Sequence, residues 1–389
     1  MITNFITNET EFIKSLKTEK HVSGYTHKFY RYPARFSPEF AREAILQFSN
    51  QGDYVLDAFM GSGTTIVEAI ANGRNAIGVD INPLSYFIAT VKTTPLSKKD
   101  KQNILEWVNR VDFKRNTNAA TYRDHEGLKH IPEEYKNILV TLINDISTIN
   151  YPRQRNFIKC VLLRFTQWAI DCREEFPHFD TLKGQLVKQT SDMLDGLDSW
   201  VSRTKEQNTA KNKITGKRQL FLGSFDEMVN YPLLDRMKSK VRLVLTSPPY
   251  PGVHVLYHRW QVKSRRETPA PFWIAGLEDG HGESYYTLGG RSKTGAKNYF
   301  TKLTEIFRSI KLFIHPDAII VQLVAFSNPD IQLPAFLNSM ELAGYEEFQP
   351  LRTITTDYLY RSVPSRKWYS IIDNNQNASN EIVLFHKPI

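Results

Sequence analysis

The sequence predicts an α/β fold with a mostly parallel sheet and a helical insertion. Short apolar strands alternate with helical segments over residues 53–92, and the same alternation resumes at Gln219. Between these stretches the chain has helical periodicity and few glycines. Alternating strands and helices form parallel sheets covered by helices. We therefore expect a lead-in and first α/β half (1–94), a mostly helical insertion (95–218) and a second α/β half (219–389).

In the first half, a helix at about 38–48 follows a polar, aromatic loop. A short apolar strand at 54–56 runs into a turn of small residues, 60–65. The helix that continues from this turn ends at Gly73, because glycine commonly terminates helices. A second strand over 75–79 completes a strand–turn–helix–strand unit, the usual beginning of a parallel sheet.

The second half contains more strands and two helices. Apolar runs predict strands, and helical spacing of apolar residues predicts helices. The expected strands are 220–222, 241–245, 318–325, 346–356 and 381–386, and the expected helices are 297–313 and 333–343. Residues 251–293 read as a long loop rich in glycine, arginine and aromatic side chains.

Composition is that of a globular protein, with 389 residues, 41% of them hydrophobic and 23% charged. The net charge of +9 suits a polyanionic partner such as nucleic acid, although a soluble protein can also simply be basic. Cys160 and Cys172 have no metal-binding spacing and cannot form a disulfide framework. Neither a signal-peptide core nor an apolar run of about 18 residues is present. We expect a cytoplasmic protein without a membrane partner.

The first chemical motif is the run Asp57-Ala58-Phe59-Met60-Gly61-Ser62-Gly63-Thr64-Thr65, followed by Asp80. Glycines after a strand let a ligand approach the backbone, and the next helix offers unpaired N–H groups. A carboxylate at the tip of the next strand can accept hydrogen bonds from ribose hydroxyls. Neither a dinucleotide fingerprint nor a phosphate loop is present. The alternative interpretation is a plain tight turn.

The second motif is Ser247-Pro248-Pro249-Tyr250 at the end of an apolar strand. Prolines cannot donate to a sheet ladder, so they end the strand and leave their carbonyls as acceptors. Acceptors on the two hydrogens of an aromatic amino group would free its lone pair for reaction. The ring of Tyr250 can stack on a base rotated out of a duplex. The alternative is a Pro-Pro turn followed by a core tyrosine.

Together these motifs resemble the amino-methyltransferase family of DNA modification enzymes. DAFMGSGTT resembles the family's Asp-Pro-Phe-x-Gly-x-Gly-Thr cofactor motif, with Ala58 in place of the usual proline. TSPPY resembles its catalytic Asp/Asn/Ser-Pro-Pro-Tyr/Phe/Trp motif, and HKFYRYPARF resembles the preceding segment. The resemblance covers roughly 25–95 and 219–389. It implies a Rossmann-like S-adenosylmethionine methyltransferase fold, with a mixed, mostly parallel seven-stranded sheet.

The resemblance also implies roles for individual residues. Where the family has Gly-Asp at its adenine-contacting position, this chain has Gly223-Ser224-Phe225-Asp226, so either Ser224 or Asp226 would take that role. The residues expected to bind S-adenosylmethionine are Tyr30, Pro33, Asp57, Phe59, Gly61, Gly63, Thr64, Asp80, Ser224 and Asp226. The residues expected to be catalytic are Ser247, Pro248, Pro249 and Tyr250.

The serine form of the catalytic motif resembles enzymes that methylate cytosine N4, whereas Asp or Asn forms are more typical of adenine N6 enzymes. We therefore expect a restriction-modification enzyme that methylates cytosine in double-stranded DNA, with a cognate endonuclease for the same site. Adenine N6 in DNA, an RNA amino group and a non-enzymatic DNA-binding protein are the alternatives. Neither cysteine follows a proline in a catalytic loop, which argues against methylation of cytosine C5. The histidines form no ligand cluster, so we expect no metal.

Basic and aromatic loops are expected to contact DNA, because arginine and lysine bind phosphates or read guanine edges. The candidates are Arg259, Lys263, Arg265, Arg266, Arg291, Arg361, Arg366, Lys367 and Trp368. Each is alternatively a solvated surface residue. The insertion either recognises the target sequence or only supports the sheet.

Overall fold

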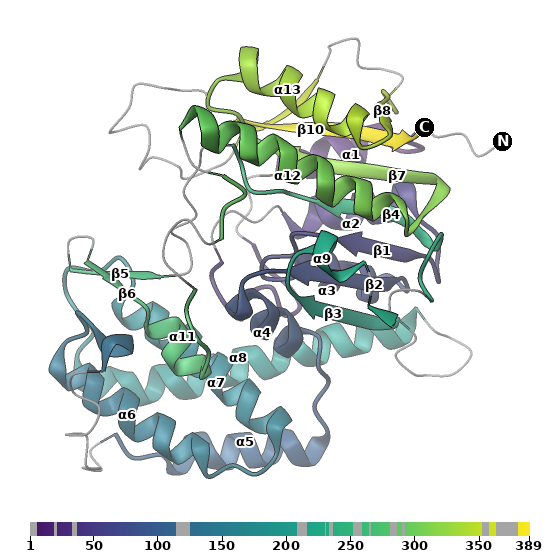
Figure 1. Ribbon diagram of the computed structural model, residues 1–389. Coiled ribbons are helices and arrows are strands. Elements are labelled where there is room, and N and C mark those ends of the chain that lie inside the picture. Colours follow the sequence, from purple (N-terminus) through teal and green to yellow (C-terminus); the bar gives the residue numbers. More distant parts are fainter. Residues whose placement is uncertain are drawn as a thin grey trace.

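The protein's structure, a computed structural model, consists of an α/β part and a helical part (Figure 1). It describes residues 6–18, 22–32, 37–113, 125–207, 216–229, 231–232, 236–251, 259–263, 266–280, 286–289, 292–351, 358–362 and 380–389. The α-helices are α1 (Glu9–Leu16), α2 (Pro38–Phe48), α3 (Thr64–Ala71), α4 (Pro83–Lys92), α5 (Lys98–Arg110), α6 (Glu133–Ser147), α7 (Pro152–Ile170), α8 (Phe179–Glu206), α9 (Phe225–Met228), α11 (Ala270–Ala275), α12 (Lys293–Lys311) and α13 (Pro329–Leu342). The strands are β1 (Tyr54–Asp57), β2 (Asn75–Asp80), β3 (Arg218–Leu222), β4 (Val241–Thr246), β5 (Trp260–Val262), β6 (Arg266–Thr268), β7 (Ile314–Val324), β8 (Tyr345–Glu347), β9 (Leu359–Ser362) and β10 (Asn380–Pro388).

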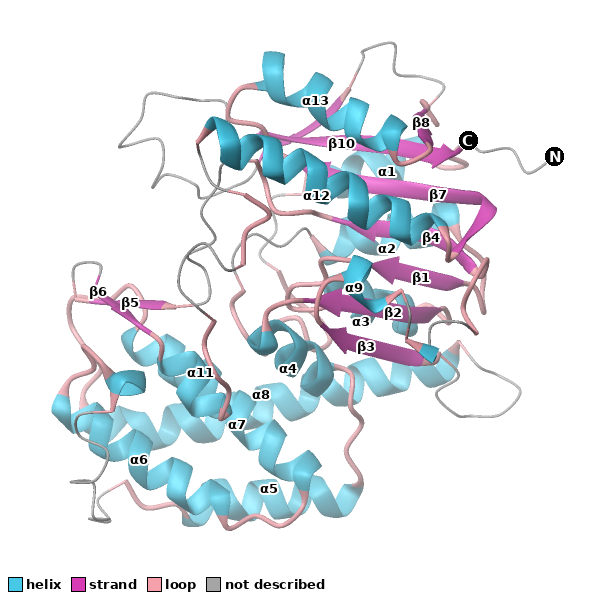
Figure 2. Ribbon diagram, in the orientation of Figure 1, coloured by secondary structure: helices cyan, strands magenta, loops and turns pink. Residues whose placement is uncertain are grey.

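The main sheet has the order β3-β2-β1-β4-β7-β10-β8 (Figure 2). The first five strands in this order run parallel, and β10 is antiparallel to β7, β8 and β9. Strands β8 and β9 pair with different stretches of β10, along the edge that β7 leaves open. Eight strands thus fill seven positions, and the expected mixed, mostly parallel sheet is confirmed.

Side chains from successive strand positions enter two separate cores, because they point to opposite faces of a sheet. On β1, Val55 joins a core that includes α1, α2 and α3, whereas Leu56 joins a core that includes α9, α12 and α13. The same alternation occurs on β4, between Leu243 and Val244. Helices therefore cover both faces of the sheet (Figure 1), and its functional groups must lie at the strand ends.

The helical part lies between β2 and β3 in the chain and contains α5 to α8. The indole Nε1 of Trp200 on α8 donates to the carbonyl of Val67 on α3 at 3.1 Å, which ties this part to the sheet. Strands β5 and β6 form an antiparallel hairpin, and α11 packs on α7. No described helix is both long and apolar enough to cross a membrane.

Two predictions for the second half are wrong in detail. Residues 251–293 were expected to be a loop, but their described part contains the β5–β6 hairpin and α11. The strand expected over 346–356 ends at Glu347 as β8, and a further strand, β9, begins at Leu359. Strands β5 and β6 have only three residues each, too few to show a clear alternating pattern, and the pairing of β8 and β9 depends on the distant strand β10.

Candidate active site

The glycine turn after β1 is held to the tip of β2. Asp80 accepts hydrogen bonds from the amides of Gly61 and Asn82, both at 2.8 Å. Gly61 has φ of +49°, and an added Cβ would lie 3.5 Å from the ring of Tyr32. A positive φ is readily adopted by glycine alone. The turn therefore brings its backbone and the carboxylate of Asp80 to the same strand edge.

Asp57 at the end of β1 is a buried junction. Its carboxylate accepts from Thr65 Oγ1 at 2.7 Å, from Thr246 Oγ1 at 2.6 Å and from the amide of Phe59 at 3.2 Å. Burial raises the pKa of Asp57 to about 6, and these three hydrogen bonds oppose the rise. The residue thus joins β1, α3 and β4, the elements that carry the two motifs.

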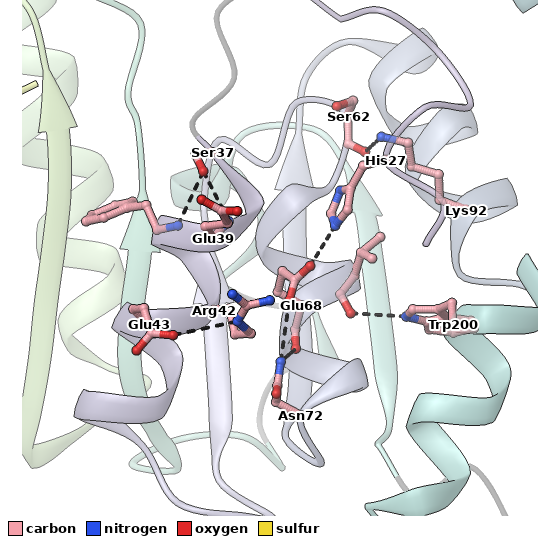
Figure 3. A network of polar contacts seen from close by, with 12 residues as sticks. His27, Ser37, Glu39, Arg42, Glu43, Ser62, Glu68, Asn72, Lys92 and Trp200 are labelled. Atoms are coloured by element: carbon pink, nitrogen blue, oxygen red, sulfur yellow. Dashed lines mark hydrogen bonds and ion pairs between the residues drawn. The ribbon is translucent and has the colours of Figure 1, made fainter. Parts of the chain in front are cut away.

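Buried polar contacts fix the positions of the turn and of α3 (Figure 3). The fully buried Lys92 on α4 donates from Nζ to the carbonyl of Ser62 at 2.8 Å. His27 Nε2 lies 2.7 Å from Glu68 Oε1 on α3, and both side chains are buried. These contacts fix the turn against α4 and fix the aromatic loop before α2 against α3.

The Ser-Pro-Pro-Tyr run follows β4, next to β1 in the sheet. The hydroxyl of Ser247 donates to the backbone carbonyl of Leu323 on β7 at 2.9 Å. The phenol of Tyr250 donates to the carboxylate of Glu381 on β10 at 2.5 Å. Ser247 is thus oriented by β7 and Tyr250 by β10, and the hydroxyl proton of Ser247 points to the carbonyl of Leu323.

One cavity of about 950 Å³ brings the two motifs together. Its lining includes these sequence-predicted residues: Phe59, Gly61, Asp80, Ser224, Ser247, Pro248, Pro249 and Tyr250. Burial raises the pKa of Asp80 to about 6, against the hydrogen bonds from Asn82 and Gly61. Further acidic side chains in the lining are Glu227, Glu278, Asp279 and Glu305, with Lys302 as a basic one. The cavity is therefore suited to a ligand that carries positive charge.

Several sequence-predicted cofactor residues lie outside this lining. They are Tyr30, Asp57, Gly63, Thr64 and Asp226, whereas Pro33 falls outside the described residues. A Cβ on Gly63 would lie 2.9 Å from Cβ of Ala89, so this glycine lets α3 pack against α4. Asp226 accepts from Lys302 Nζ at 2.6 Å and from the Ser224 hydroxyl. Of the two residues considered for the adenine-contacting position, Ser224 is the one in the lining.

Sequence reasoning missed several residues of the cavity. Tyr32 lines it instead of Tyr30, which is buried and accepts from the indole of Trp260 at 2.9 Å. The phenol oxygen of Tyr32 accepts from the hydroxyl of Ser85 at 2.9 Å. A loop with tyrosines two residues apart gives no signal as to which ring faces a ligand, so only the packing distinguishes them.

The predicted DNA contacts occupy different environments. Arg259 is paired with Asp279 at 2.9 Å and with Glu267 at 3.7 Å. Lys263 and Arg266 are exposed on the hairpin, whereas Arg361 is buried and paired with Glu381 at 2.7 Å. Arg361 therefore does not lie on an exposed surface, as a DNA contact requires. Arg265, Arg291, Arg366, Lys367 and Trp368 fall outside the described residues.

Metal-binding side chains do not gather in the part of the chain that the structure describes, where no group of three or more His, Cys, Asp or Glu is suited to a metal ion. The groups that the cavity presents to a cofactor are its acidic side chains and the backbone at Gly61.

Comparison with known proteins matches residues 8–90 to a family model described as DNA methylase, for N6 and N4 methyltransferases. Type II methyltransferase M.MjaII of Methanocaldococcus jannaschii is 35% identical over 26% of this chain and 19% of its own length. Type II methyltransferase M.MvaI of Kocuria varians is 35% identical over 26% of this chain and 22% of its own length. DNA adenine methyltransferase YhdJ of Escherichia coli is 44% identical over 14% of this chain and 19% of its own length.

The matched part of the chain thus spans about a fifth of the length of these curated relatives. It contains the lead-in, the glycine turn and Asp80, which form one side of the cavity. S-adenosylmethionine is the cofactor expected from the sequence, and the family match confirms it. Residues 8–90 thus match the DNA methylase family of N6 and N4 methyltransferases, and type II methyltransferases are among the curated relatives to which the chain is similar.

Proposed function

We propose that this protein is a site-specific DNA methyltransferase. It transfers a methyl group from S-adenosylmethionine to the exocyclic N4 of a cytosine rotated out of the duplex. The proposal extends to a role in a restriction-modification system in the cytoplasm, with an endonuclease that cuts the same recognition site. The two curated type II methyltransferases support the general activity, and the serine of the catalytic motif supports cytosine.

The orientation of Ser247 is the observation that carries the proposal. Because its hydroxyl proton is directed to the carbonyl of Leu323, its oxygen presents lone pairs to the cavity that it lines. A hydroxyl held in this way serves as an acceptor for one hydrogen of an amino group. The carbonyls of the neighbouring prolines are further acceptors, since proline contributes a C=O and no N–H.

An exocyclic amino group is a weak nucleophile because its lone pair is delocalised into the base. Acceptors on both hydrogens favour a pyramidal nitrogen, whose lone pair points at the methyl donor. The proton released after transfer passes to solvent or to an acceptor at the loop. Tyr250, beside Ser247 in the same cavity, can stack on the extruded ring. The site thus acts by positioning and hydrogen bonding.

The residues in the lining fit S-adenosylmethionine, which supplies an electrophilic methyl group on a positively charged sulfur. Asp80 at the tip of β2 is placed to accept from ribose hydroxyls. The backbone at Gly61 permits close approach, and Phe59 and Tyr32 offer apolar surface. The acidic lining suits the cofactor's positive charge.

Adenine N6 in DNA is the second candidate, because the chain is also similar to a DNA adenine methyltransferase and the matching family model includes N6 methyltransferases. An RNA amino group is the third. All three share a flat base bearing an amino group, so Ser247 and Tyr250 would act on each in the same way. Base identity is therefore the property to measure.

The test is methylation of unmethylated plasmid DNA by the purified protein with labelled S-adenosylmethionine, followed by nucleoside mass analysis. N4-methylcytosine is the expected product. N6-methyladenine would overturn the base assignment, and labelled RNA in a parallel reaction without labelled DNA would overturn the substrate. Absence of label in plasmid, genomic DNA and RNA would refute the enzymatic proposal.

A further inference from the structure

We propose that Glu381 and Arg361 form a buried pair that positions Tyr250 for stacking on the target base. The inference rests on the proposed base methylation and adds two positioning residues to it. Neither residue belongs to the glycine turn or to the Ser-Pro-Pro-Tyr run. Both come from the strands at the far edge of the sheet, β9 and β10.

The contacts form a continuous chain from the sheet edge to the catalytic loop. The phenol of Tyr250 donates to Glu381 Oε1 at 2.5 Å, and Arg361 Nη1 donates to Glu381 Oε2 at 2.7 Å. The carboxylate of Glu381 thus connects the phenol of Tyr250 to the guanidinium of Arg361. Hydrogen bonds to an ionised group are shorter and stronger than bonds between neutral groups, so the phenol position is well defined.

The pair is built into the strand register. Glu381 of β10 lies directly opposite Arg361 of β9 in their antiparallel pairing. Their side chains are only 5% and 7% exposed. Arginine neutralises the carboxylate where water cannot, and unpaired burial of either charge is strongly unfavourable. The carboxylate therefore faces the loop as a hydrogen-bond acceptor held in place by Arg361.

The consequence for Tyr250 is loss of rotational freedom at the far end of its ring. A tyrosine whose phenol is anchored presents one fixed face to the cavity that it lines. Stacking on an extruded base needs such a face, because a misplaced reacting group lowers the rate steeply. Arg361, which the sequence predicts as a DNA contact, thus acts on the catalytic loop through Glu381.

The test removes the pair without leaving a buried charge, by combining Arg361→Met with Glu381→Leu. Replacement of a buried ion pair by apolar residues of similar size is often tolerated. Tyr250→Phe removes the phenol alone, and a triple variant combines all three changes. The matched control is Lys387→Met with Glu346→Leu, because this pair also joins β10 to a neighbouring strand, β8, but is partly exposed.

Methyl transfer to plasmid DNA is measured at varied concentrations of S-adenosylmethionine, which gives kcat and the KM for this cofactor. We expect the pair-replaced variant to lose at least tenfold in kcat, with the KM for S-adenosylmethionine changed less than twofold. Tyr250→Phe should lose a similar amount, and the triple variant should lose no more than Tyr250→Phe. The control should keep wild-type kcat, because its residues touch neither Tyr250 nor the cavity.

A second measurement observes Tyr250 itself by fluorine NMR of protein labelled with 3-fluorotyrosine. The resonance absent from Tyr250→Phe identifies the residue, and it should shift in the pair-replaced variant but not in the control. Wild-type kcat in the pair-replaced variant, or multiplied losses in the triple variant, would overturn the positioning role. If wild-type protein transfers no methyl group to any nucleic acid, the proposed function fails, while an unshifted resonance shows separately that the contact is not made.

Discussion

Ser247→Ala tests the proposed chemistry most directly. In the structure the hydroxyl donates to the carbonyl of Leu323 at 2.9 Å, and Ser247 lines the cavity beside Tyr250. Alanine keeps the backbone and the Pro-Pro turn and removes only one oxygen. The target amino group then loses an acceptor in the transition state, whereas the contacts offered to the cofactor by Asp80 and Gly61 remain.

The expected magnitude follows from two separate contributions. A preorganised hydrogen-bonding group acting on developing charge contributes about 2.7–4 kcal/mol, or about 10²–10³-fold in kcat. The lost bond to Leu323 contributes about 1 kcal/mol to stability, which lowers Tm by no more than about 4 °C. We therefore expect kcat to fall by about 100-fold or more, with cofactor affinity nearly unchanged.

The assay is single-turnover transfer of a labelled methyl group to plasmid DNA, with cofactor affinity measured by equilibrium dialysis. Ser339→Ala is the matched control, because this buried hydroxyl also donates to a backbone carbonyl, at 2.9 Å, but lies on α13 away from the cavity. Wild-type kcat in Ser247→Ala would refute the acceptor argument. An equal loss in Ser339→Ala would assign the effect to folding.

Three further predictions concern cofactor, stability and DNA. The pKa of Asp80 is raised to about 6, so the carboxylate loses its charge as pH falls through 6. Cofactor affinity, measured by equilibrium dialysis, should drop about tenfold between pH 7.5 and 5. The Asp80→Asn variant should bind the cofactor weakly at both pH values, with no dependence on pH. Gly63→Ala should cost about 2–4 kcal/mol in urea unfolding, because φ is +78° and the new Cβ meets α4 at 2.9 Å, whereas Gly184→Ala on open α8 should stabilise slightly. DNA affinity by fluorescence anisotropy should fall steeply with salt, and less steeply after Lys263→Ala with Arg266→Ala; an unchanged salt slope would reject the hairpin as a phosphate contact.

The glycine turn and the catalytic run were predictable because their chemistry is local. Strand β1 ends at Asp57 and β4 ends at Thr246, so both motifs follow strands whose apolar pattern is plain in the sequence. Parallel strands place their carboxyl ends at one sheet edge, which is where open α/β sheets bind ligands. The shared cavity follows from β1 and β4 being neighbours.

The partners of these motifs were not predictable in the same way. Glu381 is 131 residues from Tyr250, and its side chain looks like an isolated charge in an apolar strand. Arg361 lies in a basic stretch that suggests a DNA contact, yet β9 pairing turns it inward against Glu381. A charged residue can be buried when a residue distant in the sequence pairs with it, and the sequence alone does not reveal such a partner.

The helical part between β2 and β3 bears on the cavity through the chain that follows the catalytic run. The amide of Cys172 donates to the carbonyl of Gln261 at 2.7 Å, and Lys159 Nζ donates to the carbonyl of Ala275 at 2.8 Å. These bonds fix β5 and α11 on α7, and the chain then returns to line the cavity at Glu278 and Asp279. The helices thus support a rim of the cavity as well as packing beside the sheet. Any contact that they make with DNA would therefore act on the same segment that lines the cavity.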